Sequence, residues 1–268
     1  MNLQGKVAVV NGASRGIGAL SAVLLAKEGA DVVVTGRTLQ ERSDLPGSLG
    51  KTVAQIQALG RRALAVKADL TREEDIDEIV RKTIAAFGRA DILVNNAALT
   101  RDEMFDAFLP MTSKSWKDQI ALNLTAPFLL CKGFAPYMVK QGGGVIINVT
   151  SGAAWNEGKA LPGIGGAPGV AYAASKAGLN RMTLALRKEL QPHKIAIIAV
   201  DPGFTATENA HDLVKTFPTL NMKYAHPTEV PAKTIAYLAT CADPQSYSGK
   251  VIVAADFARE HGLAAGAG

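Results

Sequence analysis

Residues 7–18 read VAVVNGASRGIG: an apolar β-branched run, a glycine-rich turn and the first residues of a helical stretch. Glycine lets the backbone turn sharply and lets a ligand approach it closely. A helix that starts directly after such a turn offers free N–H groups and a partial positive charge to a pyrophosphate. The spacing is Gly-x-x-x-Gly-x-Gly, whereas the common dinucleotide fingerprint is Gly-x-Gly-x-x-Gly. Glycine-rich turns are common in proteins, so the position between a first strand and a helix is what favours a phosphate-binding turn.

Outward from this turn, short apolar runs alternate with helical stretches. Strands are predicted at 7–10, 31–35, 63–66, 92–94, 145–149, 195–200 and 251–253. Helices are predicted at 18–28, 73–87, 113–138 (with a kink or break near its two prolines) and 171–190. The segments 42–50, 152–169 and 208–227 are predicted to be irregular. Near-continuous apolar strands that alternate with helices predict an α/β doubly wound domain with a parallel sheet of about seven strands, spanning residues 1–268.

Bulk properties narrow the function classes. The 268 residues carry a net charge of +5 without a dense basic block, which disfavours nucleic acid and suits a polyanionic small ligand. The two cysteines and four histidines are scattered and form no metal-ligand spacing, so no metal is expected. No apolar run has the length of a membrane span, and the first ten residues lack the pattern of a signal peptide. We therefore expect a cytoplasmic protein that does not bind membranes.

Two arginines indicate which dinucleotide would bind. About twenty residues after the glycine turn, dinucleotide-binding folds place an acid on the adenosine ribose. Here the end of the second predicted strand reads Thr35-Gly36-Arg37, and Arg15 lies within the turn itself. Either arginine alone would be taken as a solvated surface residue. Together they suit the 2′-phosphate of NADP(H) through charge-assisted bidentate bonds.

Tyr172 and Lys176 are four residues apart at the start of the helix predicted at 171–190, so they share one helical face. A free tyrosine has a pKa of about 10, and a nearby ammonium lowers that pKa by stabilising the phenolate. Such a pair is a general acid/base for carbonyl reduction or alcohol oxidation. In most proteins a tyrosine and a lysine at this spacing are surface residues, so a catalytic interpretation of this pair depends on the other motifs in the chain.

Taken together, the motifs resemble those of the short-chain dehydrogenase/reductase family, in its single-domain NADP(H)-dependent branch. The matching positions are Gly12, Gly16 and Gly18; Asp69-Leu70; Asn95-Asn96-Ala97-Ala98; Asn123; Thr150-Ser151; Tyr172 and Lys176; Pro202-Gly203; and Thr207. They cover nearly the whole chain, and the fold that the resemblance implies is Rossmann-like.

The resemblance also implies a role for each matching position. Tyr172 would be the acid/base, Lys176 would lower its pKa and hold the nicotinamide ribose, Ser151 would bond the substrate oxygen, and Asn123 would position a water that links Lys176 to solvent. Asp69 would meet the adenine, and Asn95 would hold the turn beside the cofactor. The residues expected to bind the cofactor are Gly12, Ser14, Arg15, Gly16, Ile17, Gly18, Arg37, Asp69, Leu70, Asn95, Ala97, Tyr172, Lys176, Pro202, Gly203, Thr205 and Thr207.

Four departures from the family pattern stand out. Position 11 is Asn where Thr is usual, and we expect its amide still to support the turn. Position 201 is Asp where Asn is usual, and a structural role is open to this carboxylate. The interval from Ser151 to Tyr172 is longer than usual, so a loop rich in glycine and proline would lie beside the substrate. Residues 42–50 would lengthen another loop, near the adenosine end.

The resulting hypothesis is an NADP(H)-dependent oxidoreductase that transfers a hydride between the nicotinamide and a carbonyl or alcohol carbon. Its substrate would be apolar or bulky, such as a 3-oxoacyl or steroid-like ketone; ordinary loop packing explains the same apolar residues equally well. They are Trp155, Leu161, Ile164, Phe204, Leu213, Phe217, Leu220, Met222 and Tyr224. The alternatives are an NADP(H)-binding regulatory or structural protein without turnover, and an epimerase or dehydratase, whose larger substrate domain has no room here. We also expect a homo-oligomer, either a tetramer or a dimer.

Overall fold

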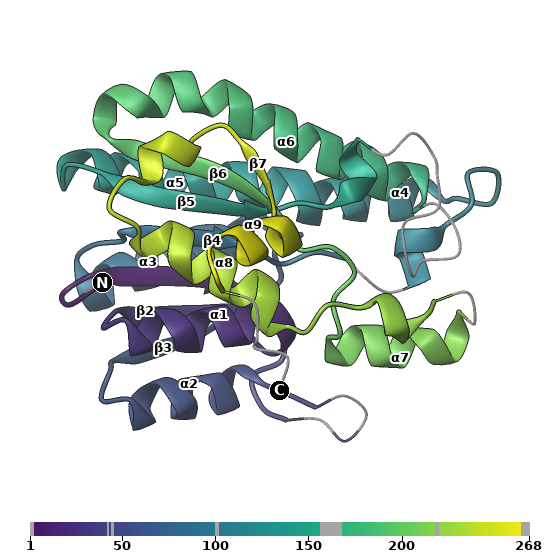
Figure 1. The fold of residues 1–268 in the computed structure, drawn as a ribbon, viewed down its shortest axis with the longest axis horizontal. Helices are drawn as coiled ribbons and strands as arrows, with labels where there is room; N and C mark the ends of the chain where they lie inside the picture. Colours follow the sequence, from purple (N-terminus) through teal and green to yellow (C-terminus); the bar gives the residue numbers. More distant parts are fainter. Residues whose placement is uncertain are drawn as a thin grey trace.

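Seven parallel strands form one twisted sheet in the order β3-β2-β1-β4-β5-β6-β7 (Figure 1). The computed structural model describes residues 3–41, 43, 46–99, 102–155, 168–217 and 220–263. The strands are β1 (Val7–Asn11), β2 (Asp31–Gly36), β3 (Ala63–Lys67), β4 (Ile92–Asn95), β5 (Gly144–Val149), β6 (Ile195–Asp201) and β7 (Val251–Val253). All seven strands predicted from the sequence are confirmed, each within one or two residues. β3 and β7 lie at the two edges and are partly exposed, which is why their burial is less complete than that of the central strands.

The chain reverses its direction of travel across the sheet at β1. It runs from β1 outward to β3, then returns to place β4 on the other side of β1, where Val10 pairs with Val94. In a doubly wound sheet, ligands bind outside the carboxyl ends of the strands at this switch point. The glycine turn after β1 and the asparagine turn after β4 therefore meet at one place.

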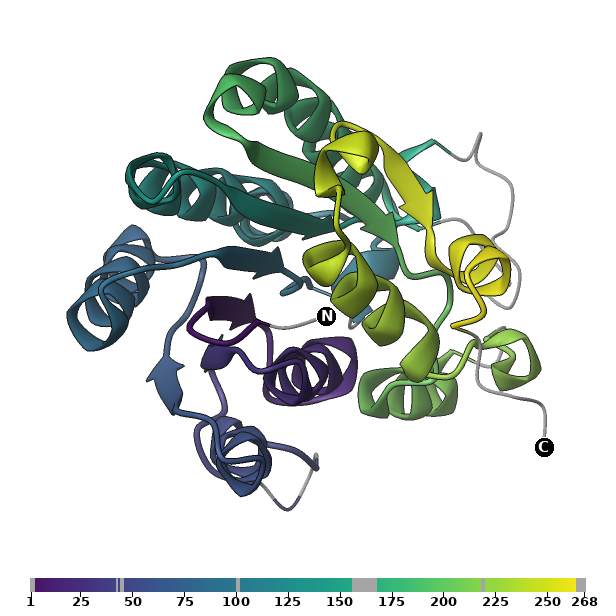
Figure 2. The ribbon, with the colours of Figure 1, turned by 60° about the vertical axis from the view of Figure 1, so that its left-hand side comes forward.

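Two layers of helices cover the sheet (Figure 2). One layer consists of α1 (Gly16–Lys27), α2 (Leu49–Ala58), α8 (Glu229–Thr240) and α9 (Ala254–Glu260). The other consists of α3 (Glu73–Phe87), α5 (Ala126–Lys140) and α6 (Val170–Leu190), and their apolar side chains pack on the opposite face of the sheet. A sandwich of this kind explains why the central strands are apolar on both faces.

The long helical stretch predicted at 113–138 is interrupted near Pro127, as predicted, but not near Pro136. It divides into α4 (Ser113–Ile120), a π-helical turn (Ala121–Thr125) and α5, and Pro136 remains inside α5. Pro127 is the second residue of α5, which continues directly from the π-helical turn, and this proline has no N–H to donate within the helix. The wider turn precedes this proline and carries Asn123, and π-turns of this kind occur frequently at functional sites.

The prediction that 208–227 is irregular was wrong in its first half. Thr207 accepts a hydrogen bond from the N–H of Ala210 and caps α7 (Glu208–Thr216), which stands beyond the carboxyl edge of the sheet (Figure 1). A single turn follows at Met222–Tyr224. Short polar helices outside the core show little apolar periodicity, so the sequence pattern did not reveal α7. Helices α2, α8 and α9 likewise lie outside the predicted helical stretches, although α2 begins at the end of the segment 42–50.

Buried amides join the switch point to the rest of the sheet. Asn11 donates to Asn95, Asn95 donates to Asn148, and Asn148 donates to Thr183 on α6, each at 2.9 Å. The Oδ1 atom of Asn11 also accepts from the N–H groups of Asn96 (2.8 Å) and Ala97 (2.6 Å). The expectation that Asn at position 11 still supports the turn is confirmed, and this residue fixes the turn after β4 against the turn after β1.

Candidate active site

The glycine turn packs so tightly at Gly12 and Gly18 that neither position has room for a side chain. Gly12 has a φ of +65°, and a Cβ atom there would lie 2.8 Å from the Cα of Ala97. A Cβ on Gly18 would lie 2.5 Å from the carbonyl oxygen of Gly12, so this position needs close backbone packing. The side chain of Arg15, at the N-cap of α1, makes no capping bond, and the first turn of α1 contains no acid. The start of α1 therefore suits a bound pyrophosphate.

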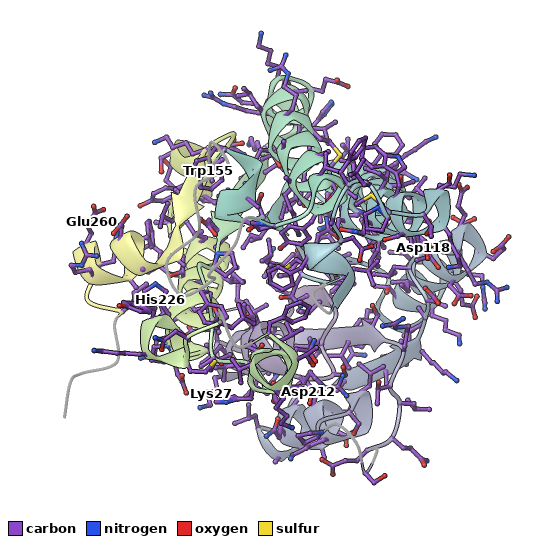
Figure 3. The ribbon with its side chains drawn as sticks, turned by 90° about the vertical axis from the view of Figure 1, so that its right-hand side faces the viewer. Lys27, Asp118, Trp155, Asp212, His226 and Glu260 are labelled. Atoms are coloured by element: carbon purple, nitrogen blue, oxygen red, sulfur yellow. The ribbon has the colours of Figure 1, made fainter. Side chains whose placement is uncertain are left out.

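A cleft of about 430 Å³ runs from this turn across the carboxyl edge of the sheet to α7. Figure 3 faces this edge, with α7 (carrying Asp212) toward the viewer and His226 above and to its left. Of the predicted site residues, those that line the cleft are Gly12, Ser14, Arg15, Gly16, Ile17, Arg37, Ala97, Ser151, Tyr172, Lys176, Pro202, Gly203, Thr205 and Thr207. The fold thus brings together residues from six separate parts of the chain.

The remaining predicted site residues lie behind or beside the cleft. Gly18 packs under the turn, and Leu70 belongs to the apolar core beneath the sheet. Asn95 is buried within the amide network described above. Asp69 lines a smaller neighbouring pocket that it shares with Arg37. Leu70 and Asn95 could therefore affect a cofactor only through the residues that they support.

At the adenosine end, Arg15 and Arg37 line the same cleft from different elements. The Nε and Nη2 atoms of Arg15 donate to the carbonyl oxygens of Pro46 and Gly47, each at 2.9 Å. These bonds tie the long loop after β2 to the glycine turn, as expected from its position near the adenosine end. Arg37 is exposed and acts, together with hydrogen bonds from Thr71, to hold the pKa of Asp69 below its usual value against the effect of burial.

Tyr172 and Lys176 lie in the first turns of α6, both buried. The Nζ atom of Lys176 lies 5.8 Å from the centre of the Tyr172 ring and donates to the carbonyl oxygen of Val149 at 2.8 Å. Ser151, one residue beyond Thr150 at the end of β5, makes a hydrogen bond to the Tyr172 side chain. The hydroxyl groups of Ser151 and Tyr172 are thus adjacent at the wall of the cleft, where charge on an oxygen atom could be stabilised.

The protonation of this pair differs from the prediction. We expected the Lys176 ammonium to lower the pKa of Tyr172. Instead, burial raises the pKa of Tyr172 to about 12, with the Asp201 carboxylate adding to the effect and the Ser151 hydrogen bond opposing it. Burial also lowers the pKa of Lys176 to about 8, opposed by Asp201. The dry surroundings disfavour both charged forms, so Tyr172 is a neutral proton donor at pH 7.

Asn123 connects the loop after β4 with the reactive helix. It is fully buried in the π-helical turn, where its Oδ1 atom accepts from the N–H of Leu99 and its Nδ2 atom donates to Ser175, each at 3.1 Å. Ser175 in turn donates to the carbonyl oxygen of Tyr172 at 2.7 Å. Asn123 therefore supports Tyr172 through Ser175 and does not itself line the cleft. Its role in positioning a water remains a prediction.

The far end of the cleft is largely apolar. Met104, Ala153, Tyr172 and Leu220 form a small buried cluster, against which Phe105 and Phe217 pack with their ring centres 4.8 Å apart. Of the apolar residues expected around a substrate, Phe204, Leu213, Leu220 and Tyr224 line the cleft, Phe217 packs on this cluster, and Trp155 and Met222 do not line the cleft. Leu161 and Ile164, with most of the loop inserted before Tyr172, lie outside the described residues.

Sequence reasoning missed several residues of this wall. Met104 and Phe105 come from a short helical turn after β4 that carries no motif. His226 was counted only as a scattered histidine, and Asp201 only as a departure from the family pattern; both line the cleft. The one available signal was at Asp201, because an acid next to the Pro202-Gly203 turn lies at the carboxyl end of a central strand. Within the described ranges, no helix is long and apolar enough to cross a membrane, and no group of three His, Cys, Asp or Glu residues could hold a metal ion.

Comparisons with known proteins agree with this arrangement. The family model described as short chain dehydrogenase matches residues 6–217. A 3-oxoacyl-[acyl-carrier-protein] reductase from Synechocystis sp. is 39% identical over 244 residues, which cover 89% of this chain and 90% of that protein. A 2-dehydro-3-deoxy-D-gluconate 5-dehydrogenase from Escherichia coli is 37% identical over 213 residues, covering 79% and 76%.

The solved structures give the same result. A metagenomic short-chain oxidoreductase in complex with NADP is 36% identical, with a TM-score of 0.74 over 94% of this chain and 97% of that one. The match to the family model includes the glycine turn, the strands β1 to β6 and the helix that carries Tyr172. The chain therefore belongs to the short-chain dehydrogenase family.

Proposed function

We propose that the protein is an NADP(H)-dependent oxidoreductase that interconverts a ketone and a secondary alcohol. The observation that carries this proposal is the single cleft into which the glycine turn, the two arginines, Ser151 and the Tyr172–Lys176 pair all open. The turn packs so closely on the turn after β4 at Gly12 that a side chain there would collide with Asn96 and Ala97, and it leads directly into the start of α1, which would hold the pyrophosphate. The whole chain would form one cofactor-binding and catalytic domain. We expect it to act in the cytoplasm.

The chemistry divides between the cofactor and the protein. NADP(H) would supply or accept the hydride. Tyr172, which is protonated at pH 7, would donate its hydroxyl proton to the oxygen of a ketone as negative charge develops there. Ser151 would donate a hydrogen bond to the same oxygen. The ammonium group of Lys176, held by the carbonyl oxygen of Val149, would lie beside Tyr172. A protonated Tyr172 is the form that ketone reduction requires.

The apolar cluster at the far end of the cleft indicates the kind of substrate. A ketone held by Ser151 and Tyr172 would extend its other substituent toward Met104, Phe105 and Leu220, which favour hydrocarbon. Both a 3-oxoacyl group, as in the name of the reductase relative, and a steroid-like ketone would suit this apolar wall. A sugar acid, as in the name of the gluconate dehydrogenase relative, would need cationic or polar partners in place of this cluster.

The direct test is NADPH oxidation with a panel of ketones at pH 7. We expect turnover with apolar ketones and 3-oxoacyl thioesters, and a kcat/KM at least about ten-fold lower for a polyhydroxylated keto acid, since each buried methylene favours binding by about 0.8 kcal/mol. A reversed order of substrates would contradict the apolar pocket. NADPH binding without turnover of any ketone would instead support the alternative, a cofactor-binding regulatory or structural protein.

A homo-oligomer, either a tetramer or a dimer, is the second part of the proposal. Large apolar side chains are exposed on three neighbouring helices: Trp116 on α4, Phe128 and Val139 on α5, and Leu184 on α6. Closed symmetric assemblies bury such surfaces between identical copies. We expect sedimentation at micromolar concentration to give the mass of a tetramer or dimer, and Phe128→Lys to shift it toward the monomer. A monomeric native protein would contradict this.

A further inference from the structure

The loop between β2 and α2 is joined at its base and braced within. Leu49 donates its N–H to the carbonyl oxygen of Thr38 at 2.9 Å, which joins the two ends of the loop. Between these ends, the N–H of Gly47 donates to the Glu41 carboxylate at 3.1 Å. The loop therefore closes on itself and leads directly into α2, which lies beside α1 (Figure 1).

Arg15 binds this loop to the glycine turn. Its Nε and Nη2 atoms, which share one edge of the guanidinium group, donate to the carbonyl oxygens of Pro46 and Gly47 at 2.9 Å each. Gly47 has a φ of +94°, and a Cβ atom there would lie 2.7 Å from the carbonyl oxygen of Ser14, so loop and turn are in direct backbone contact. A guanidinium group binds a phosphate bidentately through such an edge. In this structure that edge of Arg15 is bound to the loop instead.

A second link between the same segments comes from Thr52 in α2. Its Oγ1 atom donates to the carbonyl oxygen of Ala13 at 2.9 Å and lies 3.2 Å from the carbonyl oxygen of Ser48. Thr52 is 2% exposed and is not among the described residues that line the cleft. It can therefore act on a ligand only through the glycine turn, in which Ala13 directly follows Gly12.

We propose that Arg15 is a positioning residue for the pyrophosphate turn, which it supports by holding the loop after β2 against it. Arg15 thereby supports the binding of NADPH and NADH equally, and discrimination between them depends on Arg37, which lines the same cleft. The pyrophosphate is common to both cofactors, whereas the 2′-phosphate belongs to NADPH alone. The effect on cofactor binding rests on the proposed function, but the link between loop and turn does not.

The expected effect on affinity follows from how firmly the turn is held before a ligand arrives. A binding segment that is already fixed lowers the cost of ordering it on binding. Without Arg15, the turn keeps its binding geometry in a smaller fraction of molecules, and the apparent dissociation constant rises by the inverse of that fraction. This factor is the same for every ligand that uses the turn. A residue that only bound the 2′-phosphate would affect NADPH alone.

The first experiment measures the dissociation constants of NADPH and NADH by fluorescence titration of native protein and Arg15→Ala. We expect both constants to rise by the same factor, about ten-fold, which is the lower end of what a charge-assisted hydrogen bond contributes. Arg37→Ala should instead weaken NADPH alone. A larger loss for NADPH than for NADH in Arg15→Ala, or no loss for either cofactor, would overturn the proposal.

Variants of Thr52 test the same link at a residue outside the cleft. Thr52→Val removes the hydroxyl but keeps the shape of the side chain, so both cofactors should weaken equally, by about two-fold to ten-fold, the range of a neutral hydrogen bond. Thr52→Ser should restore both affinities. Thr83→Val is the matched control: Thr83 is also fully buried and donates to Ile79 at 2.7 Å, but within α3 on the other face of the sheet, so neither affinity should change. Native affinities in Thr52→Val would overturn the proposal.

Hydrogen exchange of the cofactor-free protein tests the link without any ligand. The amides of Gly47 and Leu49 should exchange about ten-fold faster in Arg15→Ala, because local opening costs less once the loop is released. Native exchange rates in this variant would overturn the proposal. If native protein binds neither cofactor but this exchange rises, the proposed function fails and the link between loop and turn stands. If native protein reduces a ketone with NADPH but Arg15→Ala loses affinity for NADPH alone, the role of Arg15 fails and the proposed function stands.

Discussion

Replacing Tyr172 with Phe is expected to lower kcat for ketone reduction about 10²–10⁴-fold, the usual contribution of a positioned general acid. The Phe ring would keep the packing of Tyr172 against Met104 and Ala153 in the apolar cluster, so the cleft should keep its shape. Only the hydroxyl that bonds Ser151 is lost. The affinity for NADPH should change less than about two-fold, because the hydroxyl is needed for proton transfer and little for cofactor binding.

The measurement is steady-state reduction at pH 7, together with NADPH binding followed by its fluorescence. Tyr247→Phe is the matched control: its hydroxyl lies 3.5 Å from His261 in the aromatic cluster near the C-terminus, away from the cleft, and its kcat should stay native. A near-native kcat in Tyr172→Phe would show that another group supplies the proton. Lys176→Ala should differ from both, reducing binding and kcat together.

The sheet could be predicted because each of its strands can be recognised from its own local sequence. Apolar β-branched runs such as those of β1 and β6 are buried on both faces, and every one appears in the sequence as a continuous apolar segment. The position of Tyr172 and Lys176 on one face of a helix could also be predicted, because it depends only on their separation of four residues in the sequence. α7 was not predictable in this way, because only Ala210 of its nine residues is buried and the helix depends on the Thr207 cap.

Electrostatics was the least predictable part of the site. The sequence places an ammonium four residues from a phenol, which by itself lowers the pKa of the phenol. In the folded chain Lys176 donates to Val149, and Asp201 comes from a strand twenty-five positions away to act on both groups. Burial and a long-range carboxylate therefore reverse the expected direction, and neither can be read from local spacing.

Cofactor choice should depend on Arg37. A charge-assisted hydrogen bond contributes on the order of 1.5–3 kcal/mol, so Arg37→Ala should weaken NADPH binding roughly ten-fold to a hundred-fold. NADH has no 2′-phosphate, and its affinity should barely change. Arg72→Ala is the matched control: this arginine also acts on Asp69 but does not line the cleft, so neither cofactor should be affected.

The double variant Gly36→Asp with Arg37→Leu should go further and reverse the preference. A Cβ atom at Gly36 would lie 3.6 Å from Leu49 Cδ2 and 4.0 Å from Ser14 Oγ, which are ordinary contacts, so the backbone here can carry a side chain. Its carboxylate would accept from the 2′-hydroxyl of NADH and repel the phosphate of NADPH, which combines a gain for one ligand with a penalty for the other. Comparing kcat/KM for the two cofactors in native protein and both variants decides the question. If native protein already prefers NADH, or if Arg37→Ala weakens both cofactors equally, Arg37 is a solvated surface residue and the assignment to NADP(H) is wrong.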